Sequence, residues 1–435
     1  MANLRIHEVP SPEATAALAR IADRGRRDLA ECEAEARAVV EAVRARGDDA
    51  LRELTRRFEG RELLQIEVPA AALERAAEHV SEEARSAIDL AVARVRAFHR
   101  RQLEPAWMFR DGGLLLGELV HPVRRAGIYA PGGKARYPSS VVMSVVPARV
   151  AGVDEVLLAT PSPGPEVLYA ARASGVDRVF DLGGAQAVAA LGVGTATVPR
   201  VDLVAGPGNR RVAAAKRVLF GEVGVDLLAG PSETLVVADA GAPADVVAAD
   251  LVAQAEHDEA ASAILITDDP TLARTVARLA LEQAAALPRA TIARQALEAR
   301  GAIFLVPRLE LALDIANELA PAHLVLAVAE PDPLLRRVRA AGAVFVGYGT
   351  PQVAGDFVAG PSHTLPTGGS ARFRSPLGVH TFLLRTSVVR YHAAALRQDA
   401  AAIRTFATLE GLEGHWRSVE RRLVARSVDP LRGHG

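Results

Sequence analysis

The sequence predicts an α/β protein with two tandem Rossmann-like parallel-sheet domains and helical N- and C-terminal extensions. Three observations predict this fold. The chain has 435 residues, which is too long for one hydrophobic core. From about residue 120, short apolar runs alternate with helical patterns, as in βαβ units. This alternation occurs in two series, and helical patterns precede the first series and follow the second.

The first hundred residues are predicted to be helical. Ala, Glu and Arg recur with helical periodicity in segments such as LARIADRGRRDLAECEAEARAVVEAVRARG. We assign residues 1–24 to an N-terminal helical arm. We assign residues 25–119 to the first α/β domain, which is discontinuous and resumes at residues 237–370.

The second α/β domain is expected to span residues 120–236. Its predicted strands are AGIYA, EVLLATP, RVFDLGG and VDLVAGPGN, and its helices are SSVVMSVVPARVAGV, PEVLYAARASGV and AQAVAALGVG. The later series contains the strands TLVVADAG, SAILITDD, GAIFLVP, HLVLAVA and AVFVG, with helices such as PADVVAADLVAQAEHD and PDPLLRRVRAAG between them. Residues 382–435 form a helical tail, and a tail beyond a finished sheet commonly packs on a second subunit.

Composition excludes several classes of function. The net charge of −1 gives no basic excess for nucleic acid. No run approaches the ~20 apolar residues of a membrane span, and the N-terminus lacks the apolar stretch of a signal peptide. We therefore expect a soluble, cytoplasmic protein with no nucleic-acid or membrane partner. Cys32 is the only cysteine, so no internal disulfide or thiolate-rich metal site is possible.

Glycine-rich turns follow the apolar runs, where open α/β sheets bind ligands. In GPGNRRVAAAKRVLF a glycine turn opens a helix whose free N–H groups can hold a phosphate. The turn departs from the G-x-G-x-x-G fingerprint, because Arg211 stands at the third glycine position. An ordinary tight turn is the alternative.

The segment DLVAQAEHD places Gln254 and His257 three residues apart, on one face of a predicted helix. A solvated helix end is the simpler explanation. The loop GDFVAGPSHTLPTGG carries Asp356 and His363. Imidazole, carboxylate and amide oxygen donors suit a divalent metal of the zinc-to-manganese type. Spacing alone does not establish that these donors converge.

Seven motifs in order give the sequence a specific resemblance. They are AGIYAPGGKARYPSSVVMSVVPARVAGV, GGAQAVAAL, VDLVAGPGNRRVAAAKR, LAGPSETLVVAD, DLVAQAEHD, GDFVAGPSHTLPTGGSARF and LEGLEGH. From about residue 120 to 415 the chain resembles the histidinol dehydrogenase family. The resemblance implies an NAD-dependent enzyme that oxidises L-histidinol through L-histidinal to L-histidine, at the end of histidine biosynthesis, using two NAD⁺ and a bound zinc.

The resemblance also implies roles for individual residues. One Zn²⁺ per subunit is expected on the metal ligands Gln254, His257, Asp356 and His415. His323 is the expected catalytic base, and the substrate contacts are Ser232, Gln254, His257, His323, Asp356, Glu410 and His415. The NAD positions are Tyr129, Gln186 and Asn209. The first α/β domain is then the metal and substrate side, and the second is the NAD side. A homodimer with shared active sites is expected, in which Glu410 and His415 come from the partner's tail.

One position departs from the family's pattern. The family has an acidic residue beside the histidine base, whereas this chain has Ala322 in APAHLVL. That acidic residue is thought to activate water for the aldehyde step, so histidine formation is expected to be impaired. Two alternatives remain open: a relative that oxidises another polar alcohol, such as a sulfonated diol, or a catalytically silent zinc- and nucleotide-binding homologue.

Overall fold

The computed structural model describes residues 4–132, 136–228 and 230–424. The chain divides into two compact units. The first contains residues Met1–Leu103 and Val123–Phe382, and the second contains Glu104–Pro122 and Leu383–Gly435. Both parallel sheets lie in the first unit, which confirms the predicted fold class.

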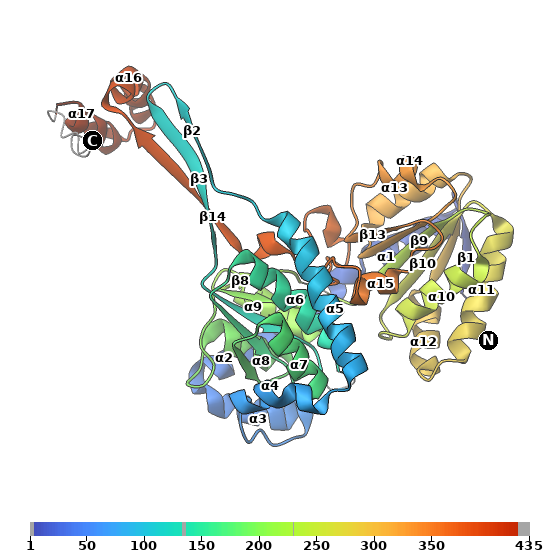
Figure 1. The fold of residues 1–435 in the computed structure, drawn as a ribbon. Helices are drawn as coiled ribbons and strands as arrows, with labels where there is room; N and C mark the ends of the chain where they lie inside the picture. Colours follow the sequence, from blue (N-terminus) through green and yellow to red (C-terminus); the bar gives the residue numbers. More distant parts are fainter. Residues whose placement is uncertain (1–3, 133–135, 229, 425–435) are drawn as a thin grey trace. The chain divides into compact units, whose positions relative to one another are not determined.

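A six-stranded parallel sheet organises the later part of the first unit (Figure 1). Its order is β1 (Ile6–Glu8), β11 (Ala302–Leu305), β10 (Ser262–Thr267), β9 (Glu233–Ala238), β12 (His323–Ala327) and β13 (Ala343–Val346). The central strands read as nearly continuous apolar runs because both faces of the sheet are covered.

Two helical layers cover the six-stranded sheet. One core contains α10 (Ala244–Ala255), α11 (Pro270–Ala285) and α12 (Ala290–Arg300). The other contains α1 (Pro12–Ala22), α13 (Leu309–Leu319) and α14 (Pro331–Leu335). Val236 belongs to the first core and Leu235 and Val237 to the second, as the alternation of side chains along a strand requires. The short helix α15 (Gln352–Phe357) follows β13.

A five-stranded parallel sheet forms the other half of the first unit. Its order is β6 (Arg178–Phe180), β5 (Glu155–Ala159), β4 (Arg125–Tyr129), β7 (Leu203–Ala205) and β8 (Gly224–Val225). One core joins it to α2 (Arg24–Arg46), α3 (Asp48–Glu59), α8 (Gly184–Val193) and α9 (Arg210–Leu219). Helices α5 (Glu82–His99), α6 (Pro138–Ala151) and α7 (Pro165–Ser174) pack together, with α6 against β4 and β5, and α4 (Ala70–Glu74) contacts α7.

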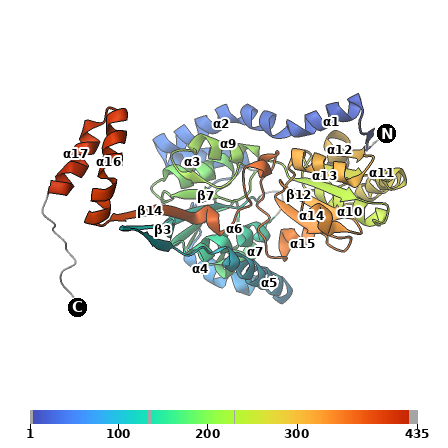
Figure 2. The same ribbon diagram turned by 90° about the horizontal axis from the view of Figure 1, so that it is seen from above.

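The N-terminal residues pack differently from the predicted grouping. Within the predicted arm, strand β1 joins the six-stranded sheet and helix α1 packs in one of the helical layers that cover it. Helices α2 and α3, which we grouped with that sheet, pack on the five-stranded one, and α2 lies beside α9 (Figure 2). The apolar stripe of α2, including Val39 and Val43, is buried there against the small side chains of α8 and α9.

The second unit is built on a three-stranded antiparallel sheet of order β14 (Leu383–Tyr391), β3 (Leu114–Pro122) and β2 (Trp107–Asp111). Helices α16 (Ala393–Leu409) and α17 (Glu413–Val424) follow β14. The predicted helical tail therefore begins with a strand, and its last residues, 425–435, lie outside the described part of the chain. Phe406, Leu409 and Val424 expose large apolar side chains. Across the described residues, no helix combines the length and apolarity needed to cross a bilayer.

Candidate functional site

His323 is the first residue of β12 and is 5 % exposed. Its Nδ1 hydrogen-bonds with the backbone carbonyl of Glu233 at 3.0 Å. Because a carbonyl only accepts, Nδ1 carries a proton, and Nε2 is the ring nitrogen left to exchange a proton with a ligand. Nε2 lies 3.5 Å from Oδ1 of Asp356 and has no hydrogen-bond partner among the described residues. The ring is therefore held in the orientation that a general base acting through Nε2 requires.

Asp356 in α15 lies among three histidines. Burial alone raises the pKa of the Asp356 carboxyl. Its interactions with His323, and then with His363 and His257, lower the pKa by more than burial raises it. The net effect lowers the pKa of Asp356, so the group is a carboxylate at neutral pH. Asp356 is therefore an anionic donor that faces imidazole side chains.

His363 is partly buried beside the same carboxylate. Its Nδ1 donates to the backbone carbonyl of Asp356 at 2.7 Å, and its Nε2 lies 3.2 Å from the hydroxyl of Ser140 in α6. Burial lowers the pKa of His363, which Asp356 opposes. The sequence drew attention to His363 without giving it a role, and it contained no signal for Ser140.

The amide of Gln254 is buried at the end of α10, and its oxygen lies 2.8 Å from the hydroxyl of Thr234. The same hydroxyl lies 2.5 Å from the amide oxygen of Gln352. One hydroxyl proton cannot serve both oxygens, and Nε2 of Gln254 is left buried without a partner. Turning the Gln254 amide by 180° lets its nitrogen donate to Thr234 and presents its oxygen at the unpartnered position.

His257 follows α10 and is exposed. Its Nδ1 donates to the backbone carbonyl of Ala253 at 2.8 Å. That bond fixes the ring and leaves the Nε2 lone pair available, as is usual for metal-binding histidines. Electrostatic interaction with His257 is also among the causes that lower the pKa of Asp356.

These donors fit a zinc ion incompletely within one chain. An amide oxygen, an imidazole and a carboxylate come from Gln254, His257 and Asp356, and zinc prefers four ligands. Among the described residues, no group of three or more His, Cys, Asp and Glu side chains is arranged to hold a metal. The predicted fourth ligand, His415, is exposed in the second unit, as is Glu410.

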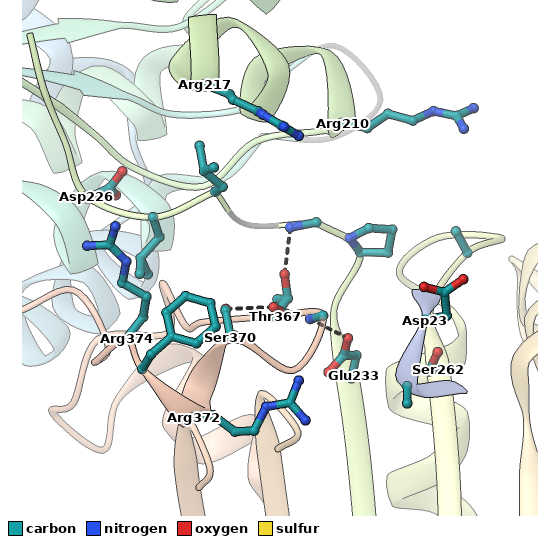
Figure 3. Close-up of a pocket in the computed structure, with 18 of the residues that line it drawn as sticks. Asp23, Arg210, Arg217, Asp226, Glu233, Ser262, Thr367, Ser370, Arg372 and Arg374 are labelled. Atoms are coloured by element: carbon teal, nitrogen blue, oxygen red, sulfur yellow. Dashed lines mark hydrogen bonds between the residues drawn. The ribbon is translucent and has the colours of Figure 1, made fainter. Parts of the chain in front are cut away.

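Ser232 lies in the segment that leads into β9, and its carbonyl accepts from the Ser262 amide at 3.1 Å. This segment is tied to residues 367–370: Gly230 donates to Thr367 Oγ1 at 2.6 Å, and Glu233 Oε1 accepts from the Gly368 amide at 2.7 Å. Both bonds lie in a pocket of about 1190 Å³ that is lined by arginines of α9 and of residues 370–374 (Figure 3). His323, Gln254, His257 and Asp356 do not line this pocket.

A separate pocket of about 410 Å³ contains all three predicted NAD positions, Tyr129, Gln186 and Asn209. Tyr129 ends β4, and Gln186 and Asn209 follow β6 and β7, so all three lie at the carboxyl ends of the five-stranded sheet, where ligands usually bind. The Tyr129 hydroxyl accepts from the Gly184 amide at 3.2 Å. Burial raises the pKa of Tyr129 to about 12, so its phenol stays protonated.

The histidines around Asp356 lie at the other edge of their sheet from the one where ligands usually bind. His323 and Glu233 begin β12 and β9, so the cluster forms at the amino ends of the six-stranded sheet. The rule that ligands bind at carboxyl ends would not have found it. Thr234, Gln352 and Ser140 were missed for a different reason: their hydrogen-bond partners lie 20, 118 and 223 residues away in the sequence.

Comparison with known proteins gives consistent matches. A family model described as histidinol dehydrogenase matches residues 22–423. A histidinol dehydrogenase of Geobacter sulfurreducens is 49 % identical over 429 residues, which cover 97 % of this chain and all of the relative. One from Syntrophotalea carbinolica is 48 % identical over 94 % of this chain and 96 % of its own.

A solved structure is similar over nearly the whole length. The crystal structure of histidinol dehydrogenase from Elizabethkingia anophelis has a TM-score of 0.91 and 31 % sequence identity. The match covers 97 % of this chain and 98 % of the other. The resemblance of the sequence motifs is thereby confirmed at the level of the family.

Proposed function

Because this chain belongs to the histidinol dehydrogenase family, we propose that it oxidises L-histidinol through L-histidinal to L-histidine with NAD⁺ and zinc. The observation that carries the proposal is the orientation of the His323 ring. Nδ1 is held by a backbone carbonyl, and Nε2 is directed to the side of Asp356. A base with a fixed lone pair beside metal-type donors suits removal of a proton from a bound alcohol.

In this proposal a metal ion binds the nitrogen atoms of the substrate. Gln254, His257 and Asp356, with His415 of a partner chain, are the residues that would hold zinc, which would anchor the imidazole and amine of histidinol. Bound NAD⁺ supplies the hydride acceptor, from the pocket that contains Tyr129 and Gln186. Buried side chains around His323 keep water away from the base.

His323 accepts the hydroxyl proton at Nε2 in the first oxidation. The second oxidation needs water to add to the aldehyde, which requires a further proton acceptor. Ala322 precedes His323, is fully buried and has no ionisable group. A thiol route is also excluded, because Cys32 is buried in the core formed by α2. We therefore propose that the second oxidation is the slow half of the reaction.

The site is proposed to be completed in a homodimer. Glu410 directly follows α16 and His415 lies in α17, and both side chains are exposed. The same helices expose the large apolar side chains of Phe406, Leu409 and Val424, which a partner chain would cover. A partner's second unit would supply the fourth zinc ligand and one substrate contact.

Product analysis tests the proposed function. The purified, zinc-loaded chain is incubated with histidinol and NAD⁺, and histidinal, histidine and NADH are quantified over time. We expect NADH and histidinal to form ahead of histidine. Absence of any NADH with histidinol, together with rapid oxidation of a sulfonated diol, would overturn the proposal in favour of a different substrate.

A further inference from the structure

Glu59, in helix α3, lines the pocket that contains the predicted NAD positions. Glu59 is the last residue of α3, and its side chain is 20 % exposed. A negative charge at a helix C-terminus destabilises the helix, so α3 gains no stability from a carboxylate at this position. Specific contacts hold it there.

Both oxygens of Glu59 are engaged. Oε1 accepts from Nε2 of Gln186 at 3.0 Å, and Oε2 accepts from Nε of Arg61 at 2.8 Å. Arg61 is in turn held by both carboxylate oxygens of Asp181 at 2.8 Å. Glu59 is therefore fixed by a guanidinium that cannot easily move, and it fixes the orientation of the Gln186 amide.

This contact determines which end of Gln186 is available to a ligand. A carboxylate is only an acceptor, so the nitrogen of the amide must face Glu59. The amide oxygen of Gln186 is then the end left to accept a hydrogen bond, for example from an amino or carboxamide group of a nucleotide. An amide without this neighbour could present either end.

The helix starts around the pocket do not offer the phosphate cradle of a glycine fingerprint. The Gly184 amide at the start of α8 already donates to Tyr129, and Asn209 Oδ1 accepts from the amides of Arg211 and Val212 at the start of α9. A Cβ on Gly183 would lie 2.9 Å from Oε1 of Glu59, so glycine allows the carboxylate to approach α8. A protein carboxylate thus occupies the position beside a helix N-terminus that an anion favours.

The described cations of the pocket are already paired. Arg61 is bound to two carboxylates, Glu59 and Asp181, which leaves that network with one net negative charge. Arg211 pairs with Glu35 at 3.0 Å. A 2′-phosphate would bring about two further negative charges at neutral pH to a pocket with no unpaired arginine among its described residues.

We propose that Glu59 is the positioning and specificity-determining residue of the nucleotide pocket: it orients the Gln186 amide and selects NAD over its 2′-phosphorylated form. This inference rests on the proposed function, because it takes NAD to be the occupant of this pocket. Glu59 acts through Gln186 and through its charge, and takes no part in hydride transfer.

The test compares Glu59→Gln with wild type by fluorescence titration of NADH and NADPH, which needs no turnover. We expect NADH to bind roughly tenfold more weakly, the size of one lost charge-assisted hydrogen bond, and the preference for NADH over NADPH to fall at least about tenfold. With histidinol, KM for NAD⁺ should rise while kcat changes less than about twofold. Glu62→Gln, which removes an exposed carboxylate paired with Arg56, is the matched control and should change neither affinity.

A double-mutant cycle with Gln186→Leu separates positioning from a general structural effect. The loss of NADH affinity in the double variant should be no greater than in Gln186→Leu alone, because Glu59 acts through Gln186. Additive losses, or a Glu59→Gln protein with wild-type NADH and NADPH affinities, would overturn the inference. If Glu59→Gln fails to fold, Gln186→Leu with Glu59 in place still has to lose NADH affinity. A wild-type protein that binds NADH but does not oxidise histidinol would instead overturn the proposed function.

Discussion

A single buried amide connects the sheet to the proposed metal site. Gln254 shares the Thr234 hydroxyl with Gln352, and one arrangement that resolves this conflict turns the Gln254 amide so that its nitrogen donates to Thr234. In that arrangement the Gln254 oxygen is free on the side away from Thr234. The residue therefore gains a hydrogen-bond partner in the core and offers an uncharged donor to a metal.

Replacing either the imidazole of His257 or the carboxylate of Asp356 should remove the metal. We expect His257→Ala and Asp356→Ala to lose most of the bound zinc, because three remaining ligands hold zinc less well than four. Elemental analysis after gel filtration measures the metal content, and circular dichroism checks the fold. His79→Ala, at an exposed histidine, should retain wild-type zinc. Full zinc content in both site variants would contradict the assignment.

We propose that Ala322, the residue before the proposed base, makes the second oxidation slow. Losing a positioned general base typically costs ~10²–10⁴-fold in rate, or about 3–5 kcal/mol of barrier. We expect Ala322→Glu to raise histidine formation at least about tenfold, with little change in zinc or histidinol affinity. Product ratios measured by chromatography test this.

Ala322→Gln is the matched control for that variant. Ala322 is fully buried, so a longer side chain changes packing as well as charge. The glutamine has nearly the same size and lacks the carboxylate, so it should not accelerate histidine formation. Equal acceleration by both variants would contradict a role for the acid.

At the scale of elements, a buried ion pair fixes helix α9 to the end of the five-stranded sheet. Nζ of Lys216 lies 2.6 Å from Oδ1 of Asp226 and 2.5 Å from the carbonyl of Gly206, and Oδ2 of Asp226 accepts from the Gly206 amide. The Lys216 and Asp226 side chains are 2 % and 0 % exposed. The pair therefore holds the turn after β7, where Gly206 has a φ of +112° and a Cβ would lie 2.1 Å from the Tyr129 carbonyl.

Breaking that pair on one side should be costly. Lys216→Met leaves the Asp226 carboxylate buried without its cation, and we expect a loss of about 3–5 kcal/mol of stability. Urea or thermal unfolding measures it. Arg217→Met, the neighbouring residue with an exposed ion pair to Glu33, should cost less than about 1 kcal/mol. The double variant Lys216→Met/Asp226→Leu should recover part of the loss, and a Lys216→Met protein as stable as wild type would show that the pair is dispensable.

At the scale of the whole molecule, the proposed ligands are divided between two units. His323, Gln254, His257 and Asp356 belong to the first unit, and Glu410 and His415 belong to the second. Subunit exchange tests whether the two units combine between chains. His323→Ala and His415→Ala are each expected to be inactive, and mixing them should restore up to about a quarter of wild-type activity if one intact site forms in each mixed dimer.

Mass spectrometry of the mixture identifies the mixed dimers independently of activity. A chain that remains monomeric at all concentrations would contradict the shared site, as would mixed dimers without activity. Mixing His415→Ala with itself after the same treatment is the control, because no intact site can form.

Sequence by itself determined most strands of both parallel sheets and the glycine turns that follow them. The apolar runs TLVVADAG and SAILITDD, for example, overlap β9 and β10. These features depend on periodicity and turn chemistry, which are local properties of the chain. The family's motifs were also recognisable, because they are contiguous segments.

Only the tertiary structure decided which distant side chains meet. The sequence did not indicate that Glu59 contacts Gln186, 127 residues later, or that α2 packs on the five-stranded sheet. It also missed strand β14, whose partner β3 lies more than 260 residues earlier in the chain. The physical reason is that such contacts depend on strand order, register and helix packing, which no local pattern specifies.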